Sequence, residues 1–213
     1  MVATVDALLP LSLLEAVRNV DTPEGDYDVE YVAELKSKRL GLSDTVFTQI
    51  RRYTEAVRKR QRTASDEASA LARLIGRRAD AEAVFRAAGC YLAREAYQTI
   101  PQFSREVLYV LPAILARPLA LRRARRIFER YVGGNLRRAG SSLVLEVTAP
   151  LTTEAAPQET GCAYYEAMLR ELLKLLIGVN GAVEHVRCRS RGEESCVWRA
   201  DWRPVDPDAG QQS

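Results

Sequence analysis

Residues 161–198 decide the fold of this chain and read "GCAYYEAMLRELLKLLIGVNGAVEHVRCRSRGEESCVW". The first half is almost entirely apolar, apart from one polar stripe at four-residue spacing, Glu166, Arg170 and Lys174. This pattern predicts a long helix that is buried over most of its circumference. Gly178 is well placed to end it, because glycine readily takes the left-handed conformation that is common after a helix C-terminus.

Two strands are predicted directly after this helix, at 182–188 and 195–203. They are joined by "RSRGEE", in which Gly192 provides the positive φ that a hairpin turn often needs. A helix that leads directly into a hairpin usually packs against one face of that hairpin. We therefore expect the start of the helix to lie near the turn of the hairpin.

The residues before this stretch are mostly helical in pattern. Apolar positions predict helices at 44–62, 66–75, 80–100, 102–112 and 119–138, with Gly133 and Gly134 able to end the last one early. A period of two at 141–149 predicts a strand. Several helices, then a strand, a long helix and a C-terminal antiparallel β-hairpin define an α+β chain.

Composition and the first residues narrow the class of protein. The chain has 213 residues, 47% hydrophobic and 28% charged, which is enough for one sizeable core. Its net charge of +3 gives only weak support for a nucleic-acid partner. Residues 1–20 have no basic n-region and are interrupted by Asp6, Pro10 and Glu15, and no later apolar run reaches the ~18 residues of a membrane span. We expect a cytoplasmic protein with no membrane span.

The hairpin holds an unusual concentration of metal-ligating residue types. The chain has four cysteines and one histidine, and His185, Cys188 and Cys196 lie within a dozen positions. Without an export signal, these cysteines point to metal binding, catalysis or core packing and not to a disulfide framework. With Cys162 at the start of the long helix, they make up the Cys₃His set of a closed structural zinc site.

Several alternatives stay open for these residues. In a regular strand His185 and Cys188 point to opposite faces, so they share a metal only if the strand bulges or ends between them. Glu184 has the parity of Cys188 and is the competing ligand. The thiols could also be unrelated core residues, because free cysteine is commonly buried. A disulfide between Cys188 and Cys196 is disfavoured in a reducing cytosol.

This stretch resembles the 4-vinyl reductase domain. The resemblance rests on a helix opened by Cys162, a strand ending in Cys188, a glycine-bearing turn, and a strand in which Cys196 precedes an aromatic residue. The family is a small-molecule-binding module of aromatic-hydrocarbon sensors and bacteriochlorophyll synthesis proteins, related in fold to haem-nitric-oxide sensor domains and TRAPP vesicle-tethering subunits. Its zinc-bearing members use three cysteines and a glutamate, which implies Cys162, Cys188 and Cys196 here, with His185 at the acidic position.

The resemblance also implies a buried apolar pocket between the helices and the sheet. The candidate lining residues are aromatic side chains, most of them with a polar tip: Phe103, Tyr109, Phe128, Tyr131 and Tyr165. Each could equally be ordinary core. The aromatic-sensor members hold a phenol hydroxyl with a histidine and a tryptophan, but the lone histidine here is assigned to the metal. An apolar or larger ligand, such as a tetrapyrrole, is therefore favoured over a phenol.

The resemblance divides the chain into three parts. Residues 79–203 would form the ligand-binding domain, and 1–78 an arm and helices that mediate dimerisation or signalling. Within this arm, 19–46 is turn-rich and charged and is interpreted as a loop with a short central helix. Residues 204–213 are polar and proline-rich, and we expect a disordered tail.

No catalytic motif accompanies these features in the sequence. There is no Gly-x-Gly-x-x-Gly turn after a strand, no P-loop and no triad candidate. We interpret the chain as a non-catalytic, homodimeric ligand-binding or sensory protein with structural Zn²⁺. The alternative is an accessory protein of bacteriochlorophyll or other tetrapyrrole metabolism. Basic clusters at 51–62 and 121–138 leave nucleic-acid binding as an outside alternative, although solvated helix faces also account for them.

Overall fold

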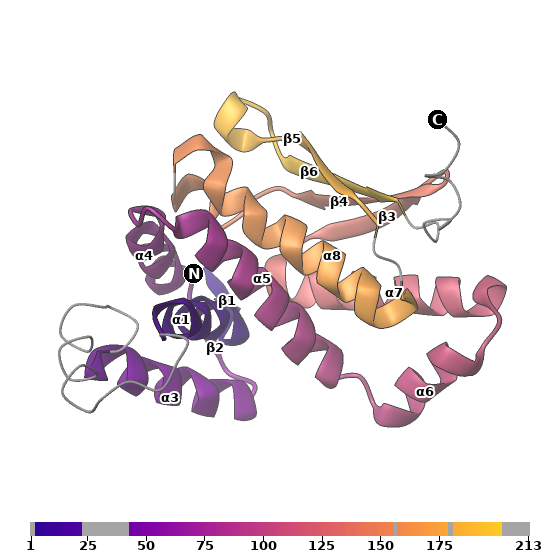
Figure 1. Cartoon of the computed structure of the whole chain (residues 1–213), viewed down its shortest axis with the longest axis horizontal. Coiled ribbons are helices and arrows are strands. Elements are labelled where there is room, and N and C mark those ends of the chain that lie inside the picture. Colours follow the sequence, from indigo (N-terminus) through magenta and orange to yellow (C-terminus); the bar gives the residue numbers. More distant parts are fainter. Residues whose placement is uncertain (1–2, 23–42, 156, 179–180, 202–213) are drawn as a thin grey trace.

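The computed structural model describes residues 3–22, 43–155, 157–178 and 181–201 (Figure 1). Helices pack against one face of a four-stranded antiparallel sheet, which confirms the α+β prediction. The helices are α1 (Leu8–Asp21), α3 (Asp44–Arg58), α4 (Ser65–Gly76), α5 (Ala81–Gln98), α6 (Gln102–Val110), α7 (Ala113–Val132) and α8 (Ala163–Ile177). The strands are β1 (Thr4–Asp6), β2 (Arg62–Ala64), β3 (Asn135–Ala139), β4 (Ser142–Val147), β5 (Val183–Arg187) and β6 (Cys196–Asp201), with short 3-10 turns η2 (Thr153–Ala155), η3 (Pro157–Cys162) and η4 (Arg189–Arg191).

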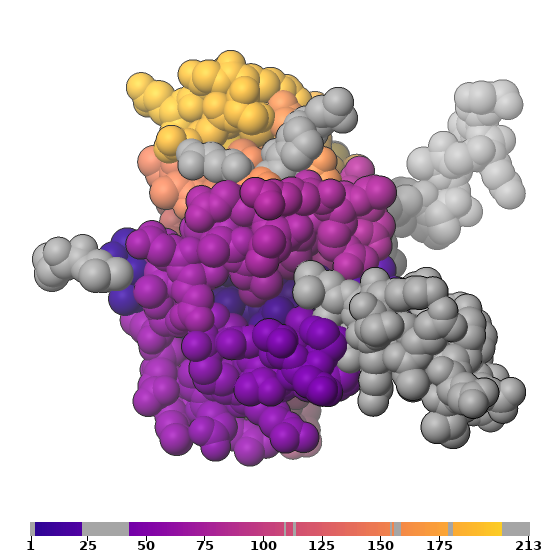
Figure 2. Space-filling view, turned by 90° about the vertical axis from the view of Figure 1, so that its left-hand side faces the viewer, coloured from indigo at the N-terminus to yellow at the C-terminus, as the bar shows by residue number. Residues whose placement is uncertain are grey.

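The elements are stacked in layers. The sheet has the order β3-β4-β6-β5, so the C-terminal hairpin of β5 and β6 lies at one edge. The helix α8 lies between the sheet and α5, and α1 packs on the other side of α5, followed by α3 (Figure 1). In Figure 2 the hairpin, in yellow, forms one end of the molecule, and α3, α4 and α5 cover most of α1. The long helix predicted at 161–178 is thus the central element of the core.

The contact between α5 and α8 depends on one glycine. A Cβ atom at Gly89 would lie 2.1 Å from the backbone oxygen of Tyr164 and 3.0 Å from the backbone nitrogen of Met168. The two helix backbones therefore touch at this position, which is possible only without a side chain. Around it, Ala88, Leu92 and other fully buried residues of α5 complete the packing. The helix α8 also ends where the sequence predicts, at Gly178, which takes the left-handed conformation with a φ of 68°.

The first helix is part of the same core. From Leu8 to Val17 every residue of α1 is buried, and the hydrophobic cluster is continuous from Ala7 through α5 and α8 to Ala200. The sequence pattern predicted no helix here. Most of the predicted arm at 19–46 lies outside the described residues. The role of residues 1–78 in dimerisation or signalling stays a prediction.

The helix predicted at 119–138 differs from the observed helix at both ends. The helix α7 starts at Ala113 and ends at Val132, because Gly133 takes a left-handed conformation with a φ of 62°. Residues 135–139 then pair with β4 as the edge strand β3. Among its side chains only Leu136 is buried, so β3 lacks the apolar alternation that identifies a strand. No helix among the described residues is long and apolar enough to cross a membrane.

Candidate metal centre and adjacent cavity

Four predicted ligands converge at the turn end of the hairpin. Cys162 immediately precedes α8, His185 lies in β5, Cys188 follows β5, and Cys196 begins β6. Their ligand atoms all lie within 4.8 Å of one another, and this set is the metal-ligand group below. The three cysteines are buried and His185 is half-buried. The structure therefore brings together a group that could hold a metal ion.

A β-bulge resolves the parity of His185 and Cys188. His185 pairs with Trp198 and Arg187 with Val197, so Val186 is an extra residue in β5. The inserted residue reverses the alternation, and His185 and Cys188 then approach the same ion position. Glu184 pairs with Arg199 in the register, is exposed, and does not belong to the metal-ligand group.

The geometry of the donors fits a tetrahedral metal ion. A tetrahedral site with metal–sulfur bonds of about 2.3 Å separates its sulfurs by about 3.8 Å. The Sγ atom of Cys188 lies 3.5 Å from that of Cys162 and 3.8 Å from that of Cys196. These separations are also too long for a disulfide, in which the sulfurs are about 2.05 Å apart, and all described cysteines are free thiols.

The histidine is oriented for coordination. The Nε2 atom of His185 is buried and has no hydrogen-bond partner among the described residues. Its Nδ1 atom lies 3.4 Å from a carboxylate oxygen of Glu159. A carboxylate on one ring nitrogen fixes the tautomer that leaves the other nitrogen free to bind a metal. A metal ion bound at this position would provide the partner that the buried Nε2 atom requires.

Glu159 orients the histidine and was not among the residues predicted from the sequence. It lies in η3, where it also forms an ion pair with Arg191, whose hydrogen bond lowers the pKa of the Glu159 carboxyl. Its φ of 64° is unusual for a residue with a side chain. The only signal in the sequence is an acid three residues before Cys162, and nothing in that spacing places it beside the histidine.

Hydrogen bonds in the group favour a thiolate at Cys196. Its pKa is lowered, firstly by the hydrogen bond from Cys162 and then by those from the backbone N–H of Arg189 and from Thr153. The N–H of Arg189 lies 3.3 Å from the Cys196 sulfur. The pKa of Cys162 is correspondingly raised, because its thiol donates a hydrogen bond to Cys196 and is buried. Thiolates are the form in which cysteine binds metals.

An open cavity of about 480 Å³ lies beside the metal-ligand group. Residues from both halves of the chain line it, among them Val5, Leu9, Tyr131, Leu151 and Tyr165. This volume is within the roughly 300–1,000 Å³ of small-molecule sites.

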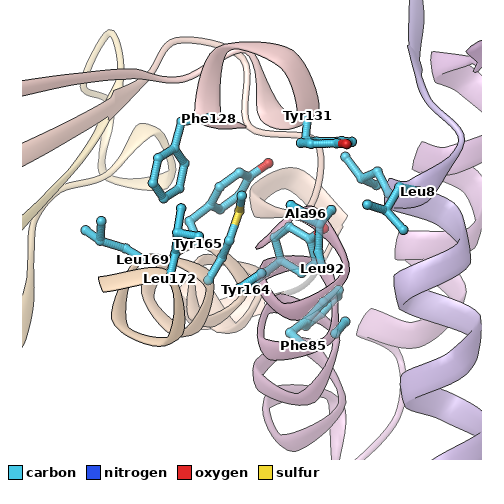
Figure 3. Packing of buried hydrophobic residues seen from close by; sticks show 14 of the residues in the cluster. Leu8, Phe85, Leu92, Ala96, Phe128, Tyr131, Tyr164, Tyr165, Leu169 and Leu172 are labelled. Carbon is cyan, nitrogen blue, oxygen red and sulfur yellow. The ribbon is translucent and has the colours of Figure 1, made fainter. Parts of the chain in front are cut away.

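Only some of the residues predicted to line a pocket lie at this cavity. Tyr131 and Tyr165 line the cavity, and Phe128 is buried in the core beside them (Figure 3). Phe103 does not line it and is 75% exposed on α6, because this short helix lies at the margin of the body. Tyr109 is in α6, and its side chain is outside the described part of the structure. The binding role of these side chains stays a prediction.

Aromatic rings connect the cavity with the metal-ligand group. The ring centroids of Tyr165 and Trp198 are 5.0 Å apart, and those of Trp198 and His185 are also 5.0 Å apart. The hydroxyl of Tyr165 accepts a hydrogen bond of 2.8 Å from the backbone N–H of Leu151, and burial raises its pKa. One wall of the cavity is therefore built on the same side chains that position the histidine.

Comparison with known proteins gives a distant similarity to solved structures. No family model matches the chain, and no curated protein matches it. Among solved structures, it is similar to a vinyl-4-reductase family protein from Methanocaldococcus jannaschii, with 12% sequence identity and a TM-score of 0.33. The match covers 89% of this chain and 92% of the other. That protein carries the name of the family that residues 161–198 resemble, and the relationship in fold is distant.

Proposed function

We propose that this chain is a non-catalytic small-molecule-binding protein in which a structural zinc ion joins the C-terminal hairpin to the start of α8. The proposal rests on one observation, the convergence of three cysteine sulfurs and one histidine nitrogen within 4.8 Å. Zinc accepts this donor set in tetrahedral geometry. Four protein ligands leave no coordination position for substrate, which supports a structural role for the ion.

The second part of the proposal is that the cavity beside this ion is the ligand site. Its volume of about 480 Å³ and its two tyrosines suit a small molecule with an apolar or aromatic body. We place the ligand-binding unit at 79–203 and assign dimerisation or signalling to 1–78, although Val5 and Leu9 of this first part also line the cavity. Output through residues 1–78 would make the protein a sensor.

The zinc site is tested by matched substitutions in β5. His185→Ala removes a ligand, so we expect the zinc content, measured by inductively coupled plasma mass spectrometry, and the melting temperature to fall together. Glu184→Ala is the control, because Glu184 is exposed on the same strand, and both values should stay at the wild-type level. Loss of zinc in the Glu184 variant alone would reassign the fourth ligand, and wild-type protein that never retains zinc would refute the site.

The ligand is tested by native mass spectrometry of the protein purified from its natural host. A bound small apolar molecule would support sensing. A bound pigment would instead support an accessory role in tetrapyrrole metabolism. Wild-type protein that carries no ligand and binds none of a set of apolar aromatic compounds would contradict the binding function.

A further inference from the structure

We propose that the corner formed by α6 and the start of α7 binds the surface of an anionic lipid membrane. The proposal is independent of the metal-ligand group and of the cavity. Among the described residues, five large hydrophobic side chains are exposed by more than half, and four of them lie in residues 103–115. These four, Phe103 (75%), Val110 (84%), Ile114 (85%) and Leu115 (57%), are called the apolar tip below. Such a concentration of exposed apolar side chains marks an interaction surface.

The apolar tip belongs to two helices at the margin of the molecule (Figure 1). Phe103 and Val110 are seven residues apart in α6, so they share one face of this helix. Ile114 and Leu115 follow in the first turn of α7. The next residue, Ala116, is only 7% exposed, so α7 packs against the body directly beside the tip. The exposed side chains are therefore presented by regular helices.

Arginines on the exposed face of α7 follow the apolar tip. The helix α7 has six arginines and one glutamate, whereas Arg105 and Glu106 of α6 offset each other. Arg122 and Arg126 are exposed, and within the described part of the chain neither has an ion pair or a hydrogen bond. Leu115, Arg122 and Arg126 are spaced by seven and four residues, so they lie on one stripe of the helix. This stripe is apolar at its start and basic further along.

The spacing along this stripe suits the depth of a membrane interface. Seven residues of helix separate Leu115 from Arg122 by about 10 Å. Amphipathic helices bury their apolar side chains about 5–10 Å into the boundary between headgroups and acyl chains. With the apolar tip inserted to this depth, Arg122 and Arg126 would lie at the level of the lipid phosphates, to which guanidinium groups bind well. An anionic lipid surface therefore provides a partner for both parts of the stripe.

Two other occupants fit this face less well. A second copy of the chain that paired through the same face would bring the arginines of both copies together, and like charges in contact cost free energy. A nucleic acid would pair with the arginines but would leave the apolar tip in water. Aliphatic side chains next to unpaired arginines are instead typical of surfaces that bind anionic lipid.

The proposal is tested by sedimentation of the zinc-loaded protein with lipid vesicles. One set of vesicles is pure phosphatidylcholine, and the other contains about one-third phosphatidylserine, which makes its surface anionic. Binding to the anionic vesicles should be at least about tenfold tighter at low salt, and the difference should shrink as ionic strength rises.

Substitutions separate the two parts of the stripe. Arg122→Gln and Arg126→Gln should each weaken binding to anionic vesicles about fivefold, which corresponds to about 1 kcal/mol for a basic residue at the membrane surface. Ile114→Ser should weaken it at least about tenfold, because it removes an apolar side chain that enters the lipid. All three side chains are exposed, so the melting temperature should stay at the wild-type level. Arg73→Gln and Leu74→Ser are the matched controls and should change nothing, because both residues are exposed on α4, away from α6 in Figure 1.

Three outcomes would overturn the proposal, and none of them affects the zinc site or the cavity. Equal binding to both kinds of vesicle, or to neither, would show that the face does not recognise anionic lipid. A dimer that Ile114→Ser dissociates in analytical ultracentrifugation, without vesicle binding, would identify a second copy as the occupant. Binding of an RNA or DNA oligonucleotide that Arg122→Gln weakens and Ile114→Ser does not would identify a nucleic-acid surface.

Discussion

Gly161→Ala tests how the metal-ligand group is positioned. A Cβ atom at Gly161 would lie 1.9 Å from the backbone oxygen of Thr152, and Cβ atoms essentially never approach closer than 3.0 Å. The two segments must therefore separate by about 1 Å in a tightly packed region. The separation would also break the 2.6 Å hydrogen bond from the Thr152 hydroxyl to the Gly161 carbonyl. It would carry Thr153 away from Cys162, with which it now makes a 3.3 Å contact.

The expected loss of stability is the sum of the cost of overpacking and the cost of the lost hydrogen bond. Overpacking costs about 1–3 kcal/mol, and the lost hydrogen bond about 1 kcal/mol. We therefore expect the free energy of unfolding at saturating zinc, measured in urea, to fall by about 2–4 kcal/mol, and the melting temperature by roughly 5–15 °C. Zinc affinity, measured by competition with a chromophoric chelator, should fall about tenfold, as for other changes in the residues that orient metal ligands.

Gly134→Ala is the control for this substitution. Gly134 is also buried, but its added Cβ would meet the ends of side chains, Leu145 at 2.9 Å and Val147 at 3.2 Å, which can shift. We expect it to cost less than about 1 kcal/mol and to leave zinc affinity unchanged. If Gly161→Ala keeps the stability and the zinc affinity of the wild type, the close approach of Thr152 does not hold the group, and the reasoning fails.

Three further predictions concern single side chains or the metal. Glu159→Gln should weaken zinc binding about tenfold in the chelator assay, because the carboxylate no longer orients His185; unchanged affinity would contradict this role. Burial raises the pKa of Glu15, so the folded chain binds more protons than the unfolded chain above the usual carboxyl pKa. Stability should therefore fall as pH rises toward the raised value, and Glu15→Gln should remove this slope in urea melts from about pH 4 to 8. Removal of zinc by a chelator should weaken binding of anilinonaphthalene sulfonate in the cavity, since Arg189 lines the cavity and its backbone N–H is hydrogen-bonded to Cys196; equal binding with and without zinc would show that the cavity is independent of the metal.

The order of elements from residue 44 onward could be predicted, because most of them have strong periodicity. The strands β2 and β3 could not, since β2 has three residues of which none is buried, and β3 is an edge strand with one buried residue and several exposed polar ones. The helix α1 was missed for the opposite reason. It is buried on all sides and so lacks a polar stripe, and Pro10 falls in its first turn, where proline is tolerated.

The members of the metal-ligand group could be selected from the sequence by residue type, but their arrangement could not be predicted. Cysteine and histidine are scarce in this chain, so their concentration in one hairpin was a strong signal. The bulge at Val186 has no signature in the sequence, and it places His185, and not Glu184, in the metal-ligand group. The cavity is lined by residues that are far apart in the sequence, such as Arg62 and Arg189, and only the tertiary fold brings them together.

The structure gives a physical reason for a metal ion at this edge of the sheet. The strand β5 is an edge strand of five residues, and none of its side chains is fully buried, so apolar packing alone stabilises it weakly. Bonds from a metal to Cys162, Cys188 and Cys196 would tie this strand, its neighbour β6 and the start of α8 to one point. Within the same group, the sulfur of Cys196 accepts a hydrogen bond from the backbone N–H of Arg189, which lines the cavity. A metal ion bound in this group would therefore also fix the position of Arg189 in the wall of the cavity.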